Sequence, residues 1–420
     1  MVALNLLPLG TLGAVEANGV VSFGLWLPWV SAADGNAVAV KIIHEDDQFL
    51  QDVPPREFVL THSVRGPYGD FWSGTLPIAG TAPAVPGSAW GTPGRYVYRY
   101  SIRNPNVGTL DWIIDPFARE FGVGKLSAFT LGYQPYVWKA SEAQWRTPAL
   151  SDLMLYEIDI AEFGGNLERV RNVIAYLKDL GVNGIEIMPL SNVGSSVDWG
   201  YLPIGYFGVD ERFGKRSDFQ ALVDMCHQHG IAVIVDVVYG HTGVDFPYYD
   251  AYTRLQYRDN PFMGPFAKDY FSNFGKSTDY NRQLTRDYFF TVNHHWLDTY
   301  HVDGFRYDCV QTTGTARWAS ATPASFTRRI NSPRLRLRRG NLIGSASTPV
   351  PARRSRWCRW PSNSRIPKAS CARVIPTAPG RIAPLTRRAA LGAVIAAGFL
   401  TSACALVCSV IRIRKPPTAT

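Results

Sequence analysis

The stretch IAVIVDVV, residues 231–238, decides the fold class because it is apolar without interruption. A strand that is hydrophobic on both faces is typical of a parallel sheet that helices cover on either side. The preceding segment SDFQALVDMCHQHG (217–230) predicts a helix, with Ser217 as its N-cap, Gln220 as the capping-box partner and Gly230 as its stop. A helix that leads into a buried strand is one repeat of an alternating α/β architecture.

The same repeat occurs on both sides of this unit. Strands are expected at 153–160 (LMLYEIDI) and 184–190 (GIEIMPL), with a helix at 167–180 between them. A helix around 285–300 then leads to a fourth strand, 302–308. Alternating strands and helices imply a parallel sheet with right-handed crossovers. A doubly wound sheet fits this order, but no glycine-rich phosphate loop follows any strand.

Polar residues stand at the ends of the third and fourth expected strands. Asp236, His241 and Asp308 occupy these positions, which favours a (β/α)8 barrel with its chemistry on the C-terminal face. Arg306 precedes Asp308 by two residues, so both side chains project from the same side of a strand. The guanidinium can then hold the carboxylate ionised and aimed, as a nucleophile requires. For this short pattern alone, a surface ion pair at a strand end is the alternative.

Two motifs carry a resemblance to a known family. DVVYGH (236–241) and GFRYD (304–308) resemble the first and second signatures of the α-amylase superfamily, glycoside hydrolase family 13, in the right order. YLKDLGVNGIEIMPL (176–190) and WGY…RFG (199–214) are similar to the stretches around the second strand in its branching-enzyme, isoamylase and trehalohydrolase branch. The resemblance covers about residues 20–310 and implies a TIM-barrel catalytic domain, of which this chain holds the first half.

The resemblance also implies a role for each matching residue. Asp308 is the expected catalytic nucleophile and Arg306 its partner. Asp236 and His241 would hold hydroxyl groups of the sugar in the cleavage subsite, and Tyr201 would stack on its ring. Without the resemblance, Asp236 could cap a helix, Tyr201 could belong to the core and His241 could be structural.

The activity that the resemblance implies is cleavage of α-1,4-glucans such as starch, glycogen or maltodextrin by a retaining mechanism. An α-1,4-glucan branching transferase is the alternative. The expected partner is an α-glucan polysaccharide or oligosaccharide, and no cofactor is implied. The family usually has Asn where this chain has Gly240, and that Asn often helps to fix a loop or a calcium ion, so no metal is predicted.

The first 150 residues lack helical periodicity and are rich in Val, Thr, Tyr, Gly and Pro. Their turns and strand candidates predict an immunoglobulin-like β-sandwich, with strands at 20–30, 37–43, 56–64 and 95–102. GDFWSGTLP (69–77) and DPFARE (115–120) resemble an N-terminal domain related to carbohydrate-binding module family 48. Trp72 and Trp90 could be sugar-stacking platforms, although burial in the core is the preferred interpretation.

The expected catalytic segment, 151–316, contains a long connection at 239–284 that is dense in Tyr, Phe and Asp. An insertion at this place matches the small extra domain that lines the substrate cleft in the family, and loops of this length are usually functional. The resemblance places a general acid after the fifth barrel strand and a further Asp after the seventh. No Asp or Glu follows Asp308. The chain as written is therefore expected to be inactive, and a glucan-binding fragment without catalysis is a further alternative.

Residues 317–420 differ in composition from everything before them. They contain 18 Arg and 2 Lys but no Asp or Glu, so the formal charge of +9 combines −11 in the body with +20 in this tail. An Arg-rich disordered arm for nucleic acid is one interpretation. A translational frameshift is the other, because degenerate codons read from the third base of Val310 onward permit a continuation with Tyr, Gly and acidic residues. The frameshift is preferred, the tail is expected to be disordered, and no nucleic-acid partner is predicted.

One segment of the tail, 389–411, has 23 residues without charge between arginines. Its length and flanks satisfy the requirements of a transmembrane helix, so membrane contact is expected only there, if at all. Small residues of this kind are also typical of out-of-frame GC-rich codons. Residues 1–19 lack the basic start of a signal peptide, and Cys226 and Cys309 suggest no disulfide framework in the body. A cytoplasmic location is expected, and the oligomeric state is open.

Overall fold

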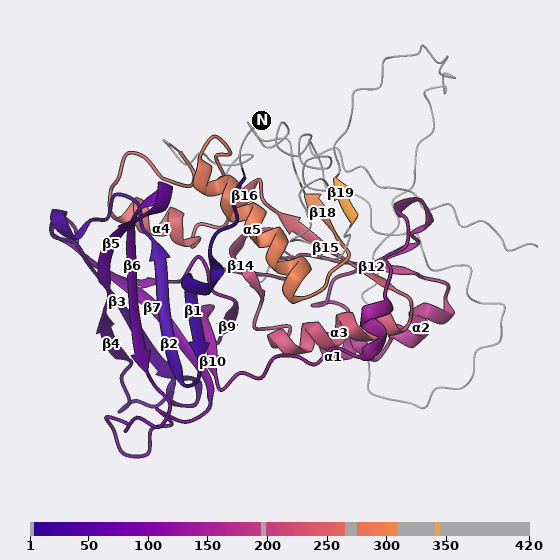
Figure 1. Ribbon diagram of the computed structural model, residues 1–420, viewed down its shortest axis with the longest axis horizontal. Helices are drawn as coiled ribbons and strands as arrows, with labels where there is room; N and C mark the ends of the chain where they lie inside the picture. Colours follow the sequence, from indigo (N-terminus) through magenta and orange to yellow (C-terminus); the bar gives the residue numbers. More distant parts are fainter. Residues whose placement is uncertain (1–3, 195–198, 265–274, 309–340, 345–420) are drawn as a thin grey trace, which may run out of the picture. The chain divides into compact units, whose positions relative to one another are not determined.

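The computed structural model describes residues 4–194, 199–264, 275–308 and 341–344. Antiparallel strands occupy the chain from Gly13 to Leu131, and a parallel sheet begins at Leu155 (Figure 1). Short 3-10 helices precede the antiparallel region and interrupt it and the linker that follows it: η1 (Leu9–Thr11), η2 (Ala32–Asp34), η3 (Glu45–Asp47), η4 (Gly66–Tyr68), η5 (Ala140–Gln144) and η6 (Leu150–Asp152).

The antiparallel strands form two sheets. The first has four strands in the spatial order β1 (Gly13–Ala17), β2 (Val20–Trp26), β6 (Gly69–Pro77) and β5 (Thr61–Arg65). The second has the order β4 (Arg56–Val59), β3 (Ala37–His44), β7 (Gly94–Asn104), β10 (Leu126–Leu131) and β9 (Glu120–Gly122), with β8 (Gly108–Ile113) also paired to β7.

Aromatic side chains from both sheets meet in one core. Phe23 of β2 lies 5.2 Å from the ring of Tyr98 and 5.9 Å from that of Phe129, both edge-on. Trp72 and Trp90 are 2% and 5% exposed, so their preferred interpretation as core residues is confirmed and neither can be a sugar platform. The immunoglobulin-like classification stays a prediction.

The expected strand at 56–64 is two strands that belong to different sheets. β4 pairs with β3, whereas β5 pairs with β6. Leu60 lies between them, is buried, and donates its backbone N–H to the carbonyl of Val38. The chain crosses from one sheet to the other at this residue, which an alternating pattern cannot reveal.

The parallel sheet has the strand order β11 (Leu155–Ile158), β12 (Gly184–Ile187), β15 (Ala232–Val238), β18 (Gly304–Asp308) and β19 (Asn341–Gly344). The first four are the strands that the sequence predicts, in the predicted order, with shorter bounds. Five α-helices accompany them in the described part of the chain: α1 (Leu167–Arg171), α2 (Ile174–Asp179), α3 (Arg216–Gln228), α4 (Pro247–Arg254) and α5 (Gln283–Thr299).

The single helix expected at 167–180 is interrupted. Val173 leaves helical geometry at φ −107° and ψ 2°, which separates α1 from α2. The predicted apolar face survives the break, because Leu167, Val170, Ile174 and Leu177 are all buried. Packing of this face on the sheet therefore does not require a continuous helix.

The predicted cap of α3 is wrong. The N-cap is Lys215 rather than Ser217, and its backbone N–H donates to the carboxylate of Asp218 at 2.7 Å. Gln220 instead points away from the helix start and donates to the carbonyl of Thr299. The stop at Gly230 is confirmed by its left-handed φ of 72°.

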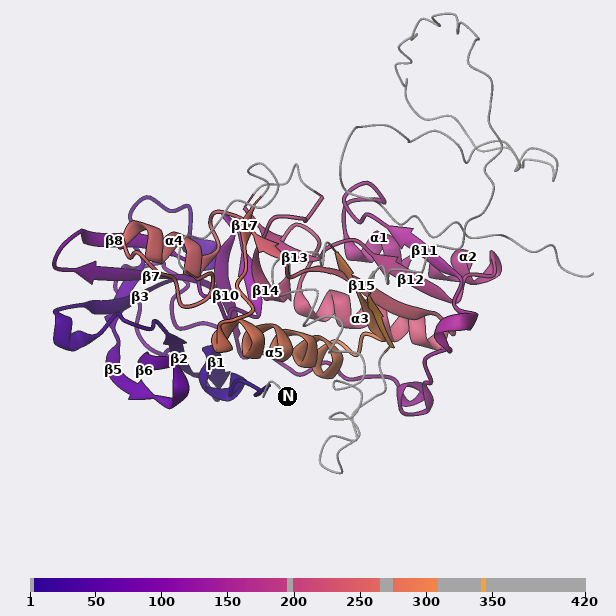
Figure 2. The same cartoon turned by 90° about the horizontal axis from the view of Figure 1, so that it is seen from above.

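The described part of the 239–284 insertion packs on the antiparallel region. Its elements are β16 (His241–Thr242), α4 and β17 (Lys276–Ser277), and β16 pairs with β17. Hydroxyl groups of Tyr248, Tyr252 and Tyr257 donate to the backbone carbonyls of residues 26, 28 and 29 respectively. The N-terminal segment lies beside α5 in both views (Figures 1 and 2), where the N–H of Asn5 donates to Asp287.

The tail is described only at β19, which pairs in parallel with Gly304–Tyr307 of β18. The predicted disorder of the remainder and the apolar segment 389–411 lie outside the described residues. Within the described ranges, no helix has the length and apolarity needed to cross a membrane.

Candidate active site

The parallel register of β15 and β18 brings the predicted site together. Asp236 lies opposite Arg306, and Val238 lies opposite Asp308, at the C-terminal ends of the two strands. Nη1 of Arg306 donates to Oδ1 of Asp308 at 2.8 Å, as period two predicts, and to Oδ2 of Asp236 at 2.8 Å. One cation therefore serves two carboxylates. Sequence reasoning missed this sharing, although aligning the two strands in parallel would have indicated it.

Tyr201 reaches the same carboxylate from the loop before β14 (Pro203–Val209), which pairs with β13 (Ser191–Val193). Its hydroxyl donates to Oδ2 of Asp236 at 2.8 Å. Burial and the nearby Asp236 raise the pKa of this phenol, so it stays protonated and remains a donor. The stacking of Tyr201 on a sugar ring stays a prediction.

His241 joins the group through the backbone. The side chain is buried, and its Nε2–H donates to the carbonyl of Tyr201 at 2.7 Å. Burial lowers the pKa of this imidazole, which favours the neutral form. All five predicted residues, Tyr201, Asp236, His241, Arg306 and Asp308, therefore form one connected set of hydrogen bonds.

The two carboxylates differ in their surroundings. The side chain of Asp308 is 24% exposed, whereas that of Asp236 is fully buried. Burial raises the pKa of Asp236 to about 7, against the opposing hydrogen bonds from Arg306 and Tyr201. Among the described residues, no group hydrogen-bonds to Oδ1 of Asp236, which leaves an acceptor free for a hydroxyl group. Asp308 is the carboxylate that a reacting atom can approach.

Arg306 keeps its charge in this setting. Burial opposes the charged form, but the contacts with Asp236 and Asp308 outweigh it and raise the pKa of the guanidinium. Its Nη1 therefore places a permanent positive charge 2.8 Å from Oδ1 of Asp308. The arrangement can thus present a charged, oriented carboxylate at a strand end, which is the requirement for covalent nucleophilic catalysis.

A further carboxylate lies in the same sheet, closer than the site to the N-terminal ends of the strands. Glu186 of β12 pairs in register with Ile234, two residues before Asp236 on β15. Burial and the neighbouring Glu157 raise its pKa. Its register places it below Asp308 rather than beside it. The alternation of β12 was the signal that could have identified it from the sequence.

The described residues contain no group of three or more His, Cys, Asp or Glu side chains arranged to hold a metal ion. At Gly240, the backbone carbonyl accepts a hydrogen bond from the N–H of Thr278 at 3.1 Å.

Comparison with known proteins gives a family match over part of the chain. Residues 138–281 match the α-amylase catalytic-domain family. The 1,4-alpha-glucan branching enzyme of Rhodospirillum rubrum is 31% identical over 269 residues, which cover 58% of this chain and 35% of the enzyme. Malto-oligosyltrehalose trehalohydrolase of Saccharolobus solfataricus is 34% identical over 165 residues, which cover 38% of this chain and 28% of that enzyme.

Solved structures agree on the fold. A putative alpha amylase from Salmonella typhimurium aligns with a TM-score of 0.54 at 22% identity, covering 79% of this chain and 48% of the other. Pullulanase from Paenibacillus barengoltzii, solved in complex with maltohexaose and alpha-cyclodextrin, aligns with a TM-score of 0.54 at 20% identity, covering 78% and 55%. The chain spans between a quarter and two fifths of the length of the curated relatives named above.

Proposed function

We propose, for a chain that belongs to the α-amylase family, that Asp308 and its neighbours are the nucleophile half of an active site for α-1,4-glucans. The observation that carries this proposal is the shared cation: Arg306 hydrogen-bonds Asp236 and Asp308 at once, on adjacent strand ends. The substrate class is starch, glycogen or maltodextrin.

In the proposed reaction, an Asp308 oxygen attacks C1 of the sugar and forms a covalent glucosyl ester. The bond from C1 to the glycosidic oxygen breaks, and that oxygen needs a proton from a second carboxylic acid. No Asp or Glu follows Asp308 in this sequence. The 420-residue chain alone therefore should not release reducing sugar from starch.

The neighbours of Asp308 are proposed to hold the sugar rather than to react. Asp236 offers its Oδ1, to which no described residue hydrogen-bonds, to a hydroxyl group of the bound ring. Tyr201 and His241, which are joined through the Tyr201 carbonyl, would complete the wall of the subsite. Because Tyr201 donates its hydroxyl to Asp236, its ring position is fixed before a sugar arrives.

A branching transferase is the second candidate for the parent activity. It shares the ester at Asp308 and differs only in the acceptor, a glucan hydroxyl in place of water. The 1,4-alpha-glucan branching enzymes among the relatives favour it; the match to that of Nitrosospira multiformis covers 70% of this chain.

Glucan binding without cleavage is a further candidate, and one surface residue favours it. Trp112 of β8 is 61% exposed, and the guanidinium of Arg99 lies 3.8 Å from its ring centroid. An exposed indole whose inner face is occupied by a cation presents its outer face to a sugar ring. A Trp112→Ala variant that binds amylopectin as well as the wild type does would exclude this surface.

The nucleophile can be tested without the missing acid. Glucosyl fluorides carry a leaving group that departs as fluoride without protonation, so Asp308 should form its C1 ester in the 420-residue chain. Hydrolysis of that ester also needs a general base, so the ester should accumulate. We expect mass spectrometry to find one added glucosyl group on the peptide that contains Asp308, after incubation with α-glucosyl fluoride.

The matched variants are Asp308→Asn, which should carry no adduct, and Asp298→Asn on the exposed side of α5, which should react as the wild type does. An adduct that persists in Asp308→Asn, or its absence from folded wild-type protein, contradicts the proposed nucleophile.

The composition of the tail is proposed to result from a frameshift near codon 310, because residues 317–420 contain 20 basic and no acidic side chains. Sequencing the gene across this codon tests it. A restored base should open a frame of several hundred codons, and a clean reading with no such frame would mean that the tail is genuine.

A further inference from the structure

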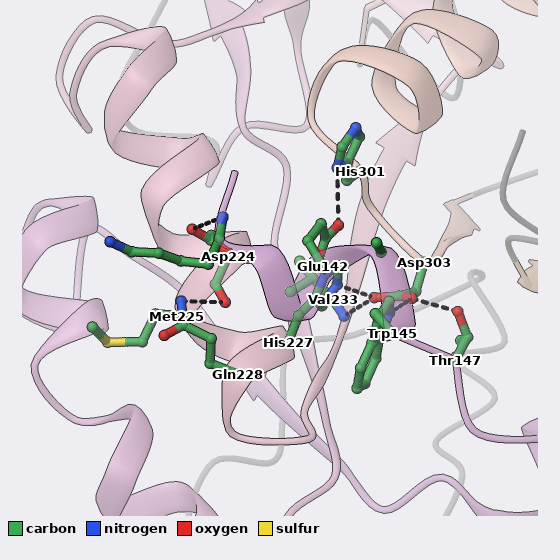
Figure 3. A network of polar contacts seen from close by, with 12 residues as sticks. Glu142, Trp145, Thr147, Asp224, Met225, His227, Gln228, Val233, His301 and Asp303 are labelled. Atoms are coloured by element: carbon green, nitrogen blue, oxygen red, sulfur yellow. Dashed lines mark hydrogen bonds and ion pairs between the residues drawn. The ribbon is translucent and has the colours of Figure 1, made fainter. Parts of the chain in front are cut away.

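A second polar network lies at the opposite end of the parallel sheet, where the strands begin (Figure 3). It joins three parts of the chain: the linker from the antiparallel region, helix α3, and the turn before β18. The linker contributes Glu142 of η5, Trp145 and Thr147. The helix contributes His227, and the turn contributes Asp303. None of these residues belongs to the site at the other end.

Asp303 is the centre of this network. Its Oδ1 accepts hydrogen bonds from Nε1 of Trp145 at 2.7 Å and from the hydroxyl of Thr147 at 2.5 Å. Its Oδ2 accepts from the N–H of Val233, the residue after the start of β15, at 2.8 Å, and contacts Nε2 of His227 at 2.9 Å. Four donors thus converge on one carboxylate that is 3% exposed.

His227 lies between two carboxylates. Its Nδ1 is 2.7 Å from Oε2 of Glu142, and its Nε2 is 2.9 Å from Oδ2 of Asp303. A neutral imidazole has one N–H, so one of these contacts would set a nitrogen lone pair against a carboxylate oxygen. The imidazolium donates to both. Trp145 stacks on the ring at 4.4 Å with planes 11° apart, which also favours the cation.

The charged and titratable groups around His227 come from every element that packs on it. Glu142 faces it from η5 and Asp303 from the turn before β18. His301, in the same turn, contacts the other oxygen of Glu142 at 2.9 Å and stacks on Trp138. Burial opposes a charge on His227, but the hydrogen bonds to Asp303 and Glu142 outweigh it and raise the pKa of the imidazole.

Two further groups adjoin on α3 itself, and neither supplies a positive charge. Asp224 accepts hydrogen bonds from the hydroxyl of Tyr136 and from the N–H of Lys139, and both connect the linker region to the helix. Burial and the charge of Asp303 raise the pKa of the Cys226 thiol, so it stays neutral.

We infer that His227 is a protonated latch that holds the linker 138–147 on the N-terminal end of the parallel sheet, and that alkaline pH releases it. Its proton is bound in the folded chain and held less tightly in the unfolded chain. The stabilisation is therefore complete below the ordinary imidazole pKa of about 6.5 and is lost as pH rises through the raised value. A network that only packs the linker would show no such dependence.

Hydrogen exchange in the 420-residue chain tests the release. Peptides that cover 138–147 are followed from pH 6 to pH 9, after correction for the intrinsic pH dependence of exchange. We expect the opening equilibrium to increase by up to about tenfold per pH unit between the ordinary imidazole pKa of about 6.5 and the raised value, and to level off above it. Linker protection that is independent of pH in the wild type would overturn the latch.

Two variants locate the proton. His227→Gln keeps donor and acceptor atoms but cannot be charged, so its linker should exchange faster and without the pH dependence. His229→Gln at the C-cap of the same helix is the matched control, because the one described hydrogen bond of the His229 imidazole goes to the carbonyl of Met225. A pH dependence that survives in His227→Gln assigns the effect to another group and overturns the proposal.

A measurement on the wild type alone covers the case in which His227→Gln does not fold. In protein labelled with ¹⁵N-histidine, both ring nitrogens of His227 should carry protons at pH 6.5. A spectrum of a neutral ring at that pH contradicts the latch whatever the variants do.

Discussion

Strands β15 and β18 carry a carboxylate–cation cluster at each end, and the two clusters are satisfied to different degrees. At the N-terminal end, Asp303 receives four donors, and both of its oxygens are used. At the C-terminal end, Arg306 and Tyr201 both donate to one oxygen of Asp236, and no described residue hydrogen-bonds to the other. The same pair of strands therefore has one saturated end and one open end.

The difference shows where this fold places stability and where it places reactivity. A saturated buried carboxylate resists change, because each lost partner exposes a desolvated group. A buried carboxylate with an unused acceptor oxygen lowers the stability of the fold when it is ionised, as the raised pKa of Asp236 indicates. The unused oxygen remains available to a ligand. We expect substitutions at the two ends to affect different measurements.

The largest effect should come from Asp303→Ala. It leaves His227, Trp145 and Thr147 without their common acceptor, and breaking a buried ion pair in this way costs about 3–5 kcal/mol of unfolding free energy. Urea denaturation measures this, with Asp298→Ala on the exposed side of α5 as the control, expected within about 0.5 kcal/mol of the wild type. A loss below about 1 kcal/mol for Asp303→Ala would remove the contrast between the two ends.

A smaller effect, with a distinct pH signature, is expected for Asp236→Asn. The folded pKa of Asp236 is about 7, above its ordinary value, so the folded chain holds a proton that the unfolded chain releases between about pH 4 and pH 7. Wild-type stability should fall across this window, by up to about 1.4 kcal/mol per pH unit from this group.

The Asn variant should lack this slope. The comparison requires urea midpoints at pH 4.5 and pH 7.5, with Asp298→Asn treated identically. If the stability of Asp236→Asn depends on pH as strongly as that of the wild type, Asp236 has the environment of a solvated carboxylate, and its burial does not destabilise the fold.

The smallest effects should come from removing a single hydroxyl at each end. Thr147→Val deletes one of the four donors to Asp303 and should cost about 1 kcal/mol. Tyr201→Phe should cost less, because burial raises the pKa of Asp236 and its carboxyl group keeps the contact with Arg306. Thermal melts at pH 7 compare the two variants. A larger loss of stability for Tyr201→Phe than for Thr147→Val would contradict the proposal that the network at the N-terminal end contributes more to stability.

The site at the C-terminal ends of β15 and β18 is predicted well from the sequence, because the patterns that indicate it lie within short stretches of the chain. Two residues of spacing place Arg306 and Asp308 together, and continuous apolar runs predict the strands that carry them. The sharing of Arg306 with Asp236 depends on how two strands 70 residues apart align, which no local pattern contains.

The saturated end could not be predicted in this way. Glu142, His227 and Asp303 lie in a linker, on a helix and in a turn, with no motif that joins them. The N-cap of α3 was predicted wrongly at Ser217. In the structure the N-cap is Lys215, because the carboxylate of Asp218 accepts the backbone N–H of that residue. The crossing at Leu60 was missed for a related reason: strand propensity is alike on both sides of it.

The tyrosine contacts of the insertion have a consequence for how the chain tolerates substitution. The hydroxyl groups of Tyr248, Tyr252 and Tyr257 donate to main-chain oxygens of residues 26, 28 and 29, and the rings of Tyr252 and Tyr257 also lie edge-on to the ring of Trp29. Substitutions at these three positions can therefore keep the hydrogen bonds, provided the path of the backbone is kept, whereas a change at Trp29 also removes its ring contacts. The tyrosines themselves have no such freedom, so the two partners in this contact should evolve at unequal rates.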